Sequence, residues 1–292
     1  VQRLNDHLRH IAHVGEIAGL SSIAVDDGRL MLQQGADELG YRRSVGTFRI
    51  LPLTEHIEKR SNRYFRQIAK ECLELKKRGK KVIIVSSGAV GFGRAILKQQ
   101  KALQLPQASV GEKQALASLG QSLLIETYRN AFARHKLAAA QILLTRTDFE
   151  NKSHLQNLRS TLNQLLEWGA IPVINENDAI ANEEIKLGDN DNLSADIALL
   201  YPKSVLILLT TIDAFYANGA RVPHIGQITA DIKRNAGSAS GGGTGGMVTK
   251  LQAADKMLKA KQIMSIASGK KIQIVRRLMS GADIGTWFSA EK

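Results

Sequence analysis

The chain has 292 residues, of which 43% are hydrophobic and 23% charged, the composition of an ordinary globular protein. Its formal net charge of +13 favours anionic partners, and a nucleotide with an acidic small molecule would satisfy it as well as nucleic acid. The aromatic content of 5% argues against nucleic acid, because base stacking needs exposed rings. The densest basic run, residues 76–81, falls at the end of a predicted helix, and we interpret it as a solvated helix end.

Cysteine and histidine usage limits the possible sites. Cys72 is the only cysteine, which excludes an intramolecular disulfide and a cysteine-based zinc site, and it falls in register with the apolar residues of a predicted helix. His7, His10 and His13 are spaced by three but lack a carboxylate or thiol partner, so no metal ligands are assigned. With neither a membrane-length apolar run nor a visible signal peptide, we expect a cytoplasmic protein.

The first 40 residues do not follow the pattern of the rest. We predict that residues 1–40 form a divergent N-terminal extension of uncertain structure and that residues 41–292 form one domain. The chain begins with Val1, so a truncated start, a misread start and a genuine extension all stay open.

From residue 45 onward, β-branched runs alternate with amphipathic segments. The runs predicted as strands are Val45–Ile50, Val82–Val85, Ala139–Leu144, Ile171–Asn175, Val205–Thr210 and Ile263–Ala267. Apolar stripes over residues 64–75 and 155–166 predict helices between them. Runs that are apolar on both faces belong in a parallel sheet covered by helices on each side. The predicted class is therefore α/β, a three-layer αβα sandwich with a mainly parallel central sheet, whose ligands gather at the carboxyl ends of the strands.

Residues 241–250, Gly-Gly-Gly-Thr-Gly-Gly-Met-Val-Thr-Lys, are the most informative segment. Glycines let successive backbone N–H groups turn toward one anion, and the apolar periodicity after Met247 predicts a helix whose positive end faces that anion. The segment is not a Walker motif, because Lys250 lies four residues beyond the last glycine. A phosphate cradle is favoured over the alternative, a solvated Gly/Ser linker.

Polar segments follow the predicted strands at four places. The segments are Ser86-Ser87-Gly88, Asn175-Glu176-Asn177-Asp178, Gly188-Asp189-Asn190-Asp191-Asn192 and Thr210-Thr211. Asn192 is a candidate cap for the helix that follows. A simple turn would explain one Asn-Asp pair, and an ion-binding turn is the alternative for residues 188–192, although the EF-hand spacing is absent. Four such segments favour a binding site at one edge of the sheet.

Together these segments resemble the amino acid kinase family, in its glutamate-phosphorylating branch. The motifs that carry the resemblance are Val-Ser-Ser-Gly-Ala-Val-Gly-Phe-Gly (85–93), Gln-Ile-Leu-Leu-Thr-Arg (141–146), Val-Ile-Asn-Glu-Asn-Asp-Ala (173–179), Lys-Leu-Gly-Asp-Asn-Asp-Asn-Leu-Ser-Ala (186–195) and Gly-Thr-Gly-Gly-Met-Val-Thr-Lys (243–250). Residues 285–288, Gly-Thr-Trp-Phe, look like the end of the short form that lacks the RNA-modifying-enzyme-type (PUA) C-terminal domain.

The resemblance implies transfer of the γ-phosphoryl group of ATP to the γ-carboxylate of L-glutamate, the first step of proline biosynthesis. Ser87, Asp178 and Asn190 would hold glutamate, Lys250 would neutralise charge on the transferred phosphoryl group, and Asp191 would orient the lysine. The residues implied for ATP are Thr210, Thr211, Thr244, Gly245, Gly246, Met247, Val248, Thr249 and Lys250. Mg²⁺ would bridge the phosphates, with no protein metal ligand assigned.

The sequence departs from the family pattern at three positions. Ser44 aligns with a lysine that approaches the phosphates, Thr211 stands where an Asp is usual, and Ala214 replaces a usual Gly. These departures leave a second hypothesis open, a pseudokinase that binds ATP or glutamate in a regulatory role. The resemblance further implies a homo-oligomer and a functional link to glutamyl phosphate reductase.

Overall fold

The computed structural model describes residues 22–24, 45–50, 57–99, 108–181, 190–238 and 246–290. For residues 22–24, 45–50 and 57–62 the description is of the backbone alone. Ser44, the three N-terminal histidines, Thr244 and Gly245 lie outside these ranges, as does the predicted domain boundary at residue 40.

A nine-stranded sheet forms the centre of the molecule, with the strand order β4-β5-β3-β1-β2-β6-β10-β11-β9. Its strands are β1 (Ser22–Ala24), β2 (Val45–Ile50), β3 (Lys81–Val85), β4 (Ala139–Leu144), β5 (Ile171–Glu176), β6 (Val205–Thr210), β9 (His224–Ile225), β10 (Ile263–Ser268) and β11 (Thr286–Phe288). A separate hairpin pairs β7 (Tyr216–Ala217) with β8 (Ala220–Arg221). The six predicted strands are confirmed and run parallel. Strand β1 is antiparallel to its neighbours, and β11 is antiparallel to β10 but parallel to β9.

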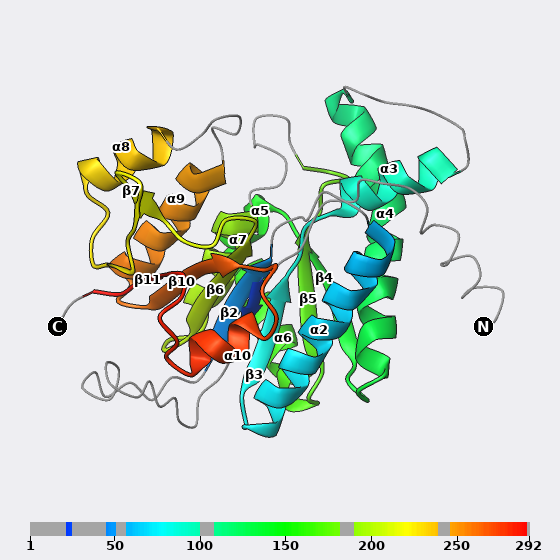
Figure 1. The fold of residues 1–292 in the computed structure, drawn as a ribbon. Helices are drawn as coiled ribbons and strands as arrows, with labels where there is room; N and C mark the ends of the chain where they lie inside the picture. The colour runs from blue at the N-terminus through cyan, green and yellow to red at the C-terminus, as the bar shows by residue number, and fades with distance from the viewer. Residues whose placement is uncertain are drawn as a thin grey trace.

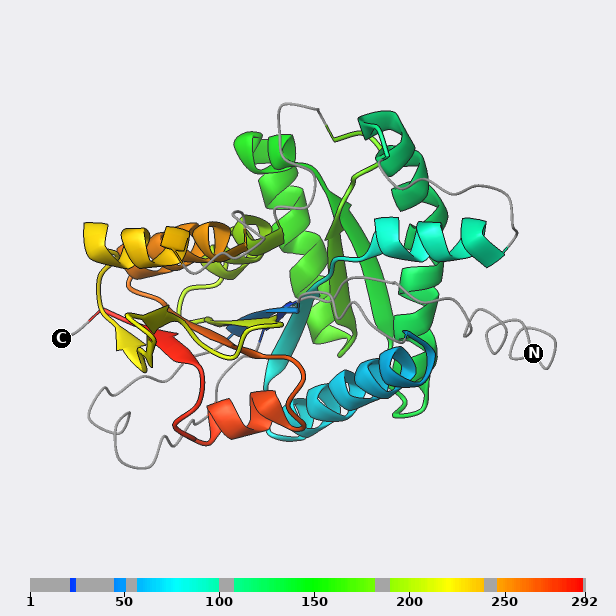
Figure 2. The same cartoon turned by 45° about the horizontal axis from the view of Figure 1, so that its top comes forward.

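Helices cover both faces of this sheet, as Figures 1 and 2 show. They are α2 (Ile57–Lys77), α3 (Ala89–Gln99), α4 (Val110–Ala133), α5 (Arg146–Glu150), α6 (Lys152–Glu167), α7 (Asn190–Leu199), α8 (Ala230–Ser238), α9 (Gly246–Lys259) and α10 (Ile274–Met279). One core cluster joins α2, α4 and α10 to one face of the sheet, and two others join α6, α7, α8 and α9 to the opposite face. The predicted three-layer αβα class is therefore confirmed. None of the helices in the described ranges is both long and apolar enough to cross a membrane.

The core follows from the sequence pattern of the strands. In β3 and β6, the apolar residues point alternately to the two helical layers, with Ile83 in one cluster and Ile84 in another. β-Branched side chains pack well on a pleated surface that is buried on both faces. Cys72 is fully buried in the larger cluster and burial raises its pKa well above the usual value, which confirms the prediction of an inert core cysteine.

Two glycines allow α3 and α4 to cross in contact. A Cβ atom on Gly93 would lie 1.9 Å from the carbonyl oxygen of Leu116, and one on Gly120 would lie 1.9 Å from that of Ala89. Real atoms cannot approach so closely, so both positions require glycine. The crossing brings the middle of α4 to the start of α3, which directly follows β3.

The register of β2 bears on the predicted alignment of Ser44. Val45 pairs with Lys81, the first residue of β3, whereas Ser87 follows the last residue of that strand. Val45 therefore lies at the amino end of a parallel sheet, opposite to the polar segments. Ser44 itself lies outside the described residues, and its alignment stays a prediction.

Candidate functional site

The carboxyl ends of the parallel strands β3, β5 and β6 lie at one edge of the sheet, and the polar segments follow them. In Figure 1, β3 and β5 run upward, and the chain that follows each of them lies at the top of the sheet. Ser87 follows β3, Asp178 follows β5 and Thr210 ends β6. Residues from segments about 120 positions apart in the sequence are thereby gathered at one edge, as the parallel topology predicts.

Helix α7 begins at this edge with two polar residues in succession. Asn190 and Asp191 are each 2% exposed, although Asn and Asp are usually found on the surface. The N–H groups in the first turn of a helix carry a partial positive charge, which favours the carboxylate of Asp191 at this place. The two side chains enter two separate hydrogen-bond networks.

The first network is built from neutral side chains, and we call it the amide network: Gln121, Asn175, Asn190 and Ser87. The Nδ2 atom of Asn190 donates to Ser87 Oγ at 2.7 Å and to Asn175 Oδ1 at 3.3 Å. Asn175 Nδ2 in turn donates to Gln121 Oε1 at 2.8 Å. The network therefore extends from α4 through the ends of β5 and β3 to the start of α7.

The second network, which we call the charged network, contains Asp191, Thr249 and Lys250. The hydroxyl of Thr249 donates to Asp191 Oδ2 at 2.6 Å, and Lys250 Nζ lies 3.3 Å from the same oxygen. Lys250 Nζ also donates to the carbonyl oxygen of Gly246 at 2.6 Å. The lysine is only 2% exposed, and a buried ammonium group requires such partners. The network thus holds a cation at the first turns of α9.

Asp178 is a buried carboxylate close to a second one. Burial, and to a lesser extent the negative charge of Glu176, raise its pKa from 3.8 to about 7. Among the residues that the structure describes, no cation contributes to this pKa. A cationic group brought beside Asp178 would stabilise its ionised form, so the site is suited to an ammonium group.

Other residues predicted for the nucleotide lie near α9 or at the end of β6. Thr210 is buried and its carbonyl oxygen accepts a hydrogen bond from the N–H of Gly269 at 2.9 Å, while Thr211 is exposed beyond the strand. Met247 packs against the core cluster beneath α9, and Val248 is exposed. The placement of these side chains toward a nucleotide stays a prediction.

The predicted capping role of Asn192 is wrong. Helix α7 begins at Asn190, so Asn192 lies inside its first turn rather than before it. Its Nδ2 atom donates to Gln252 Oε1 at 3.3 Å, which links α7 to α9. The prediction placed the helix start at Leu193. In the structure Asp191, two residues earlier, already belongs to the first turn.

Two members of the amide network were not predicted as site residues. Asn175 is the residue before the last of β5, and only its place in the Asn-Glu-Asn-Asp run could have singled it out. Gln121 carries no motif, and its one sequence signal is that it follows Gly120, which allows the close helix crossing. A single sequence does not reveal that crossing.

Residues 54–268 match the amino acid kinase family. This span covers well over half of the chain, so the protein belongs to the amino acid kinase family.

Curated relatives define the similarity more narrowly. The chain is 42% identical over 236 residues to "Glutamate 5-kinase" of Citrifermentans bemidjiense, covering 77% of this chain and 62% of the relative. It is 44% identical over 231 residues to "Glutamate 5-kinase" of Trichlorobacter lovleyi, covering 76% and 60%. The protein of the same name from Proteus mirabilis is 41% identical over 234 residues, covering 77% and 63%. The matches thus span about three fifths of the length of these relatives.

Among solved structures, the fold is similar to that of a carbamate kinase from Giardia. The TM-score is 0.56 at 15% sequence identity, over 79% of this chain and 91% of the other. At this identity the similarity shows a shared fold alone.

Proposed function

We propose that this protein transfers the γ-phosphoryl group of ATP to the γ-carboxylate of L-glutamate, giving L-glutamyl 5-phosphate, the first step of proline biosynthesis. The observation that carries the proposal is the start of α7, where Asn190 joins a neutral network and Asp191 joins a buried lysine. An amino acid and a phosphate can then be held on adjoining sides of one helix start. The names of the curated relatives support glutamate as the acceptor.

In this proposal, glutamate is bound by Ser87, Asp178 and Asn190. Asp178 and the amide oxygen of Asn190 accept hydrogen bonds from the α-ammonium group. The Ser87 hydroxyl already accepts a hydrogen bond from Asn190, so its own O–H is free to donate to a substrate carboxylate. Charge-assisted hydrogen bonds of both kinds fix the orientation of the acceptor.

The chemistry requires positioning and charge neutralisation rather than a general base, because a carboxylate is already a nucleophile. A γ-carboxylate oxygen of glutamate forms a bond to the γ-phosphorus, and the bond from that phosphorus to the β–γ bridging oxygen breaks. ADP leaves with the electron pair. Lys250 neutralises charge on the transferred phosphoryl group, and Asp191 and Thr249 hold the ammonium group in place.

The described residues fit a metal that is carried by the nucleotide. They contain no group of three or more His, Cys, Asp or Glu side chains that could hold a metal ion by themselves. Mg²⁺ is commonly bound through substrate phosphates, waters and one or two carboxylates, and Asp191 is the buried carboxylate nearest to Lys250. When bound, Mg²⁺ would neutralise phosphate charge.

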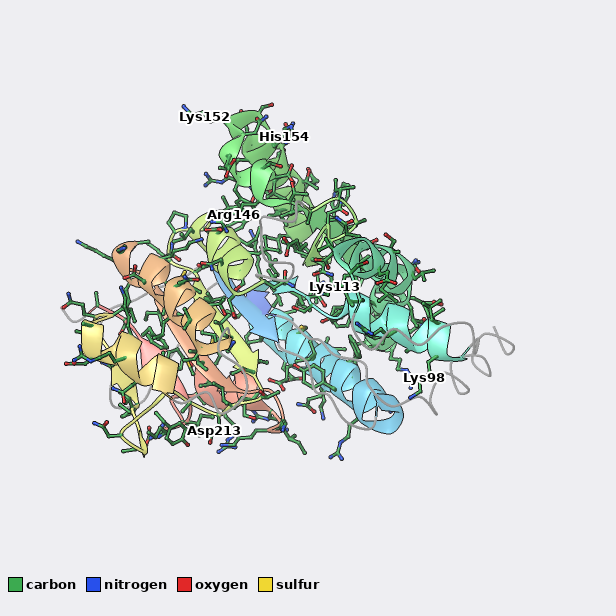
Figure 3. The ribbon with its side chains drawn as sticks, turned by 90° about the horizontal axis from the view of Figure 1, so that it is seen from above. Lys98, Lys113, Arg146, Lys152, His154 and Asp213 are labelled. Carbon is green, nitrogen blue, oxygen red and sulfur yellow. The ribbon has the colours of Figure 1, made fainter. Side chains whose placement is uncertain are left out.

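Cations around the carboxyl-end face would favour the approach of both anionic substrates. Figure 3 looks down on this face and labels Arg146, which follows β4, and Lys113, near the start of α4. Both side chains are exposed. Positive charge around a binding site raises the local concentration of anions and their association rate.

We further propose that the protein is a cytoplasmic homo-oligomer that works with a glutamyl phosphate reductase. An acyl phosphate hydrolyses readily in water, so an enzyme that reduces it must be close in the reaction sequence.

The test is a coupled assay of ADP release with ATP, Mg²⁺ and L-glutamate, in which hydroxylamine traps the acyl phosphate as a hydroxamate. We expect hydroxamate to form with L-glutamate and to be lost in Lys250→Ala. Aspartate, N-acetylglutamate and nucleoside monophosphates are the competing acceptors. Turnover with one of these instead would overturn glutamate as the substrate, and binding of ATP or glutamate without turnover would support a pseudokinase.

A further inference from the structure

One buried acceptor in the amide network lacks a donor. The Oδ1 atom of Asn190 is buried and has no hydrogen-bond partner among the residues that the structure describes. A buried polar atom without a partner loses the free energy of its hydration, so such atoms are rare outside functional sites. Asn190 belongs to the proposed substrate site, which makes a substrate N–H the expected donor.

The orientation of the Asn175 side-chain amide is fixed by the backbone N–H of Glu176. The N–H of Glu176 donates to Asn175 Oδ1 at 2.9 Å, and a backbone N–H can only donate. The oxygen of Asn175 must therefore face the backbone, which places its Nδ2 atom toward Gln121. The distance of 2.8 Å from that nitrogen to Gln121 Oε1 completes the arrangement.

The orientation of the Asn175 amide in turn determines the orientation of the Asn190 amide. Because Asn175 presents an oxygen, Asn190 must present its Nδ2 atom, at 3.3 Å, since two acceptor oxygens would repel each other. The second hydrogen of that nitrogen points to Ser87 Oγ at 2.7 Å. Asn190 Oδ1 is then left on the other side of its amide as an acceptor.

We propose that Gln121 is a positioning residue for substrate recognition: through Asn175 it holds the Asn190 amide with its oxygen toward the α-ammonium group of the amino-acid substrate. This inference rests on the proposed function, because it takes the ligand to be an amino acid. Asp178 supplies the charge that attracts the ammonium group, and Asn190 Oδ1 supplies a directed acceptor. Without Gln121, the Nδ2 atom of Asn175 loses its acceptor, and only the N–H of Glu176 then holds the two amides in this orientation.

Two substitutions separate this role from a purely structural one. Gln121→Met has a similar length but no acceptor for Asn175, whereas Gln121→Glu keeps an acceptor oxygen. Ser122→Ala is the matched control, because Ser122 is the next residue of α4 and its exposed hydroxyl bonds only to Leu119 O at 3.3 Å in the structure. We expect Gln121→Met to raise KM for L-glutamate about three- to tenfold with KM for ATP unchanged. We expect Gln121→Glu and Ser122→Ala to stay within about twofold of the wild type, a smaller change than the loss of one hydrogen bond.

The decisive readout compares L-glutamate with glutarate, which has both carboxylates but no ammonium group. Calorimetry with the full chain should show that Gln121→Met weakens glutamate binding and leaves glutarate binding unchanged, so that the preference between the two falls. Equal weakening of both acids, or an unchanged preference, would overturn the proposal. If Gln121→Met does not fold, the preference of Gln121→Glu decides, and a loss of preference there overturns it.

Failure of the proposed function would be distinguishable. If the wild type produces no hydroxamate from glutamate but binds an amino acid more tightly than its desamino analogue, the activity is wrong. A fall of that preference in Gln121→Met would then still support the inference.

Discussion

The two networks that meet at the start of α7 differ in chemistry although they begin at neighbouring residues. The amide network is neutral and each of its hydrogen bonds has one allowed direction, set by the N–H of Glu176. The charged network joins one carboxylate to one ammonium group and one hydroxyl, all on the same oxygen, Asp191 Oδ2. In the proposed function, the first network serves recognition and the second neutralises charge.

The difference between the networks explains how one helix start could bind both proposed substrates. Neutral amides discriminate between ligands through donor and acceptor directions, because a misplaced partner leaves a buried group unpaired. A buried lysine contributes most where negative charge develops during the reaction. Substitutions in the amide network should therefore change KM for glutamate, and substitutions in the charged network should change kcat.

The largest effect is expected for Lys250→Ala. Removing the cation should lower kcat by about 10²- to 10³-fold with little change in KM for glutamate, as for other groups that stabilise a transition state. Lys256→Ala is the matched control, since Lys256 pairs with Asp196 at 2.7 Å between the same two helices but is partly exposed. Steady-state kinetics check the prediction. Equal losses in both variants would mean that Lys250 only holds α9 to α7.

Asp178→Asn should have the next largest effect, on the binding of glutamate rather than on kcat. An ammonium group that loses a charged partner binds more weakly, and KM for glutamate should rise about 10- to 100-fold with KM for ATP unchanged. Calorimetry with each ligand separately checks this. Parallel loss of ATP and glutamate binding would show that the segment after β5 supports the whole edge and does not form a glutamate site.

The pH dependence should report the same carboxylate. Its pKa of about 7 means that it is largely protonated at pH 6 and ionised at pH 8, so KM for glutamate should fall about tenfold across this range. Since the folded pKa lies above 3.8, the folded protein holds the extra proton between the two values, and the free energy of unfolding decreases as the pH rises through that window. Asp178→Asn should flatten both profiles. A wild-type KM that is constant from pH 6 to 8 would contradict the assignment.

Thr249→Val should have the smallest effect and should sharpen the comparison within the charged network. It removes the 2.6 Å hydrogen bond to Asp191 but keeps the charges, so kcat should fall about fivefold, the equivalent of one hydrogen bond. Thr249→Ser keeps the hydroxyl and should behave as the wild type. If Thr249→Val instead raises only KM for ATP, the hydroxyl binds the nucleotide and does not position Asp191.

The sequence predicted the long strands of the sheet better than the short ones. The six parallel strands are long, β-branched and apolar, and such runs are identified by their periodicity. Strands β1, β9 and β11 contain two or three residues and are held by pairing with their neighbours, which a local pattern does not encode. The helix start at Asn190 was missed for a similar reason, because the apolar periodicity begins only at Leu193.

The sequence predicted those candidate site residues whose own chemical type, within a motif, indicates a role. Asp191 and Lys250 are in contact as expected, and Ser87 meets Asn190 as their proposed common ligand implies. Gln121 was not predictable, because its role depends on two glycines that bring α4 against α3 and on the direction of a backbone N–H in β5. Such dependence on tertiary geometry leaves no local signature.

The succession of Asn190 and Asp191 also constrains how this site can vary. Consecutive residues of a helix are separated by a rise of about 1.5 Å and a rotation of about 100°. One peptide unit therefore holds Asn190 of the proposed acceptor site at a nearly constant separation from Asp191, which contacts the buried Lys250. In the proposed function, a change of side chain at position 190 would alter which acceptor is recognised and leave the position of Asp191 unchanged. An insertion or deletion between the two residues would rotate one network away from the other and uncouple recognition from transfer.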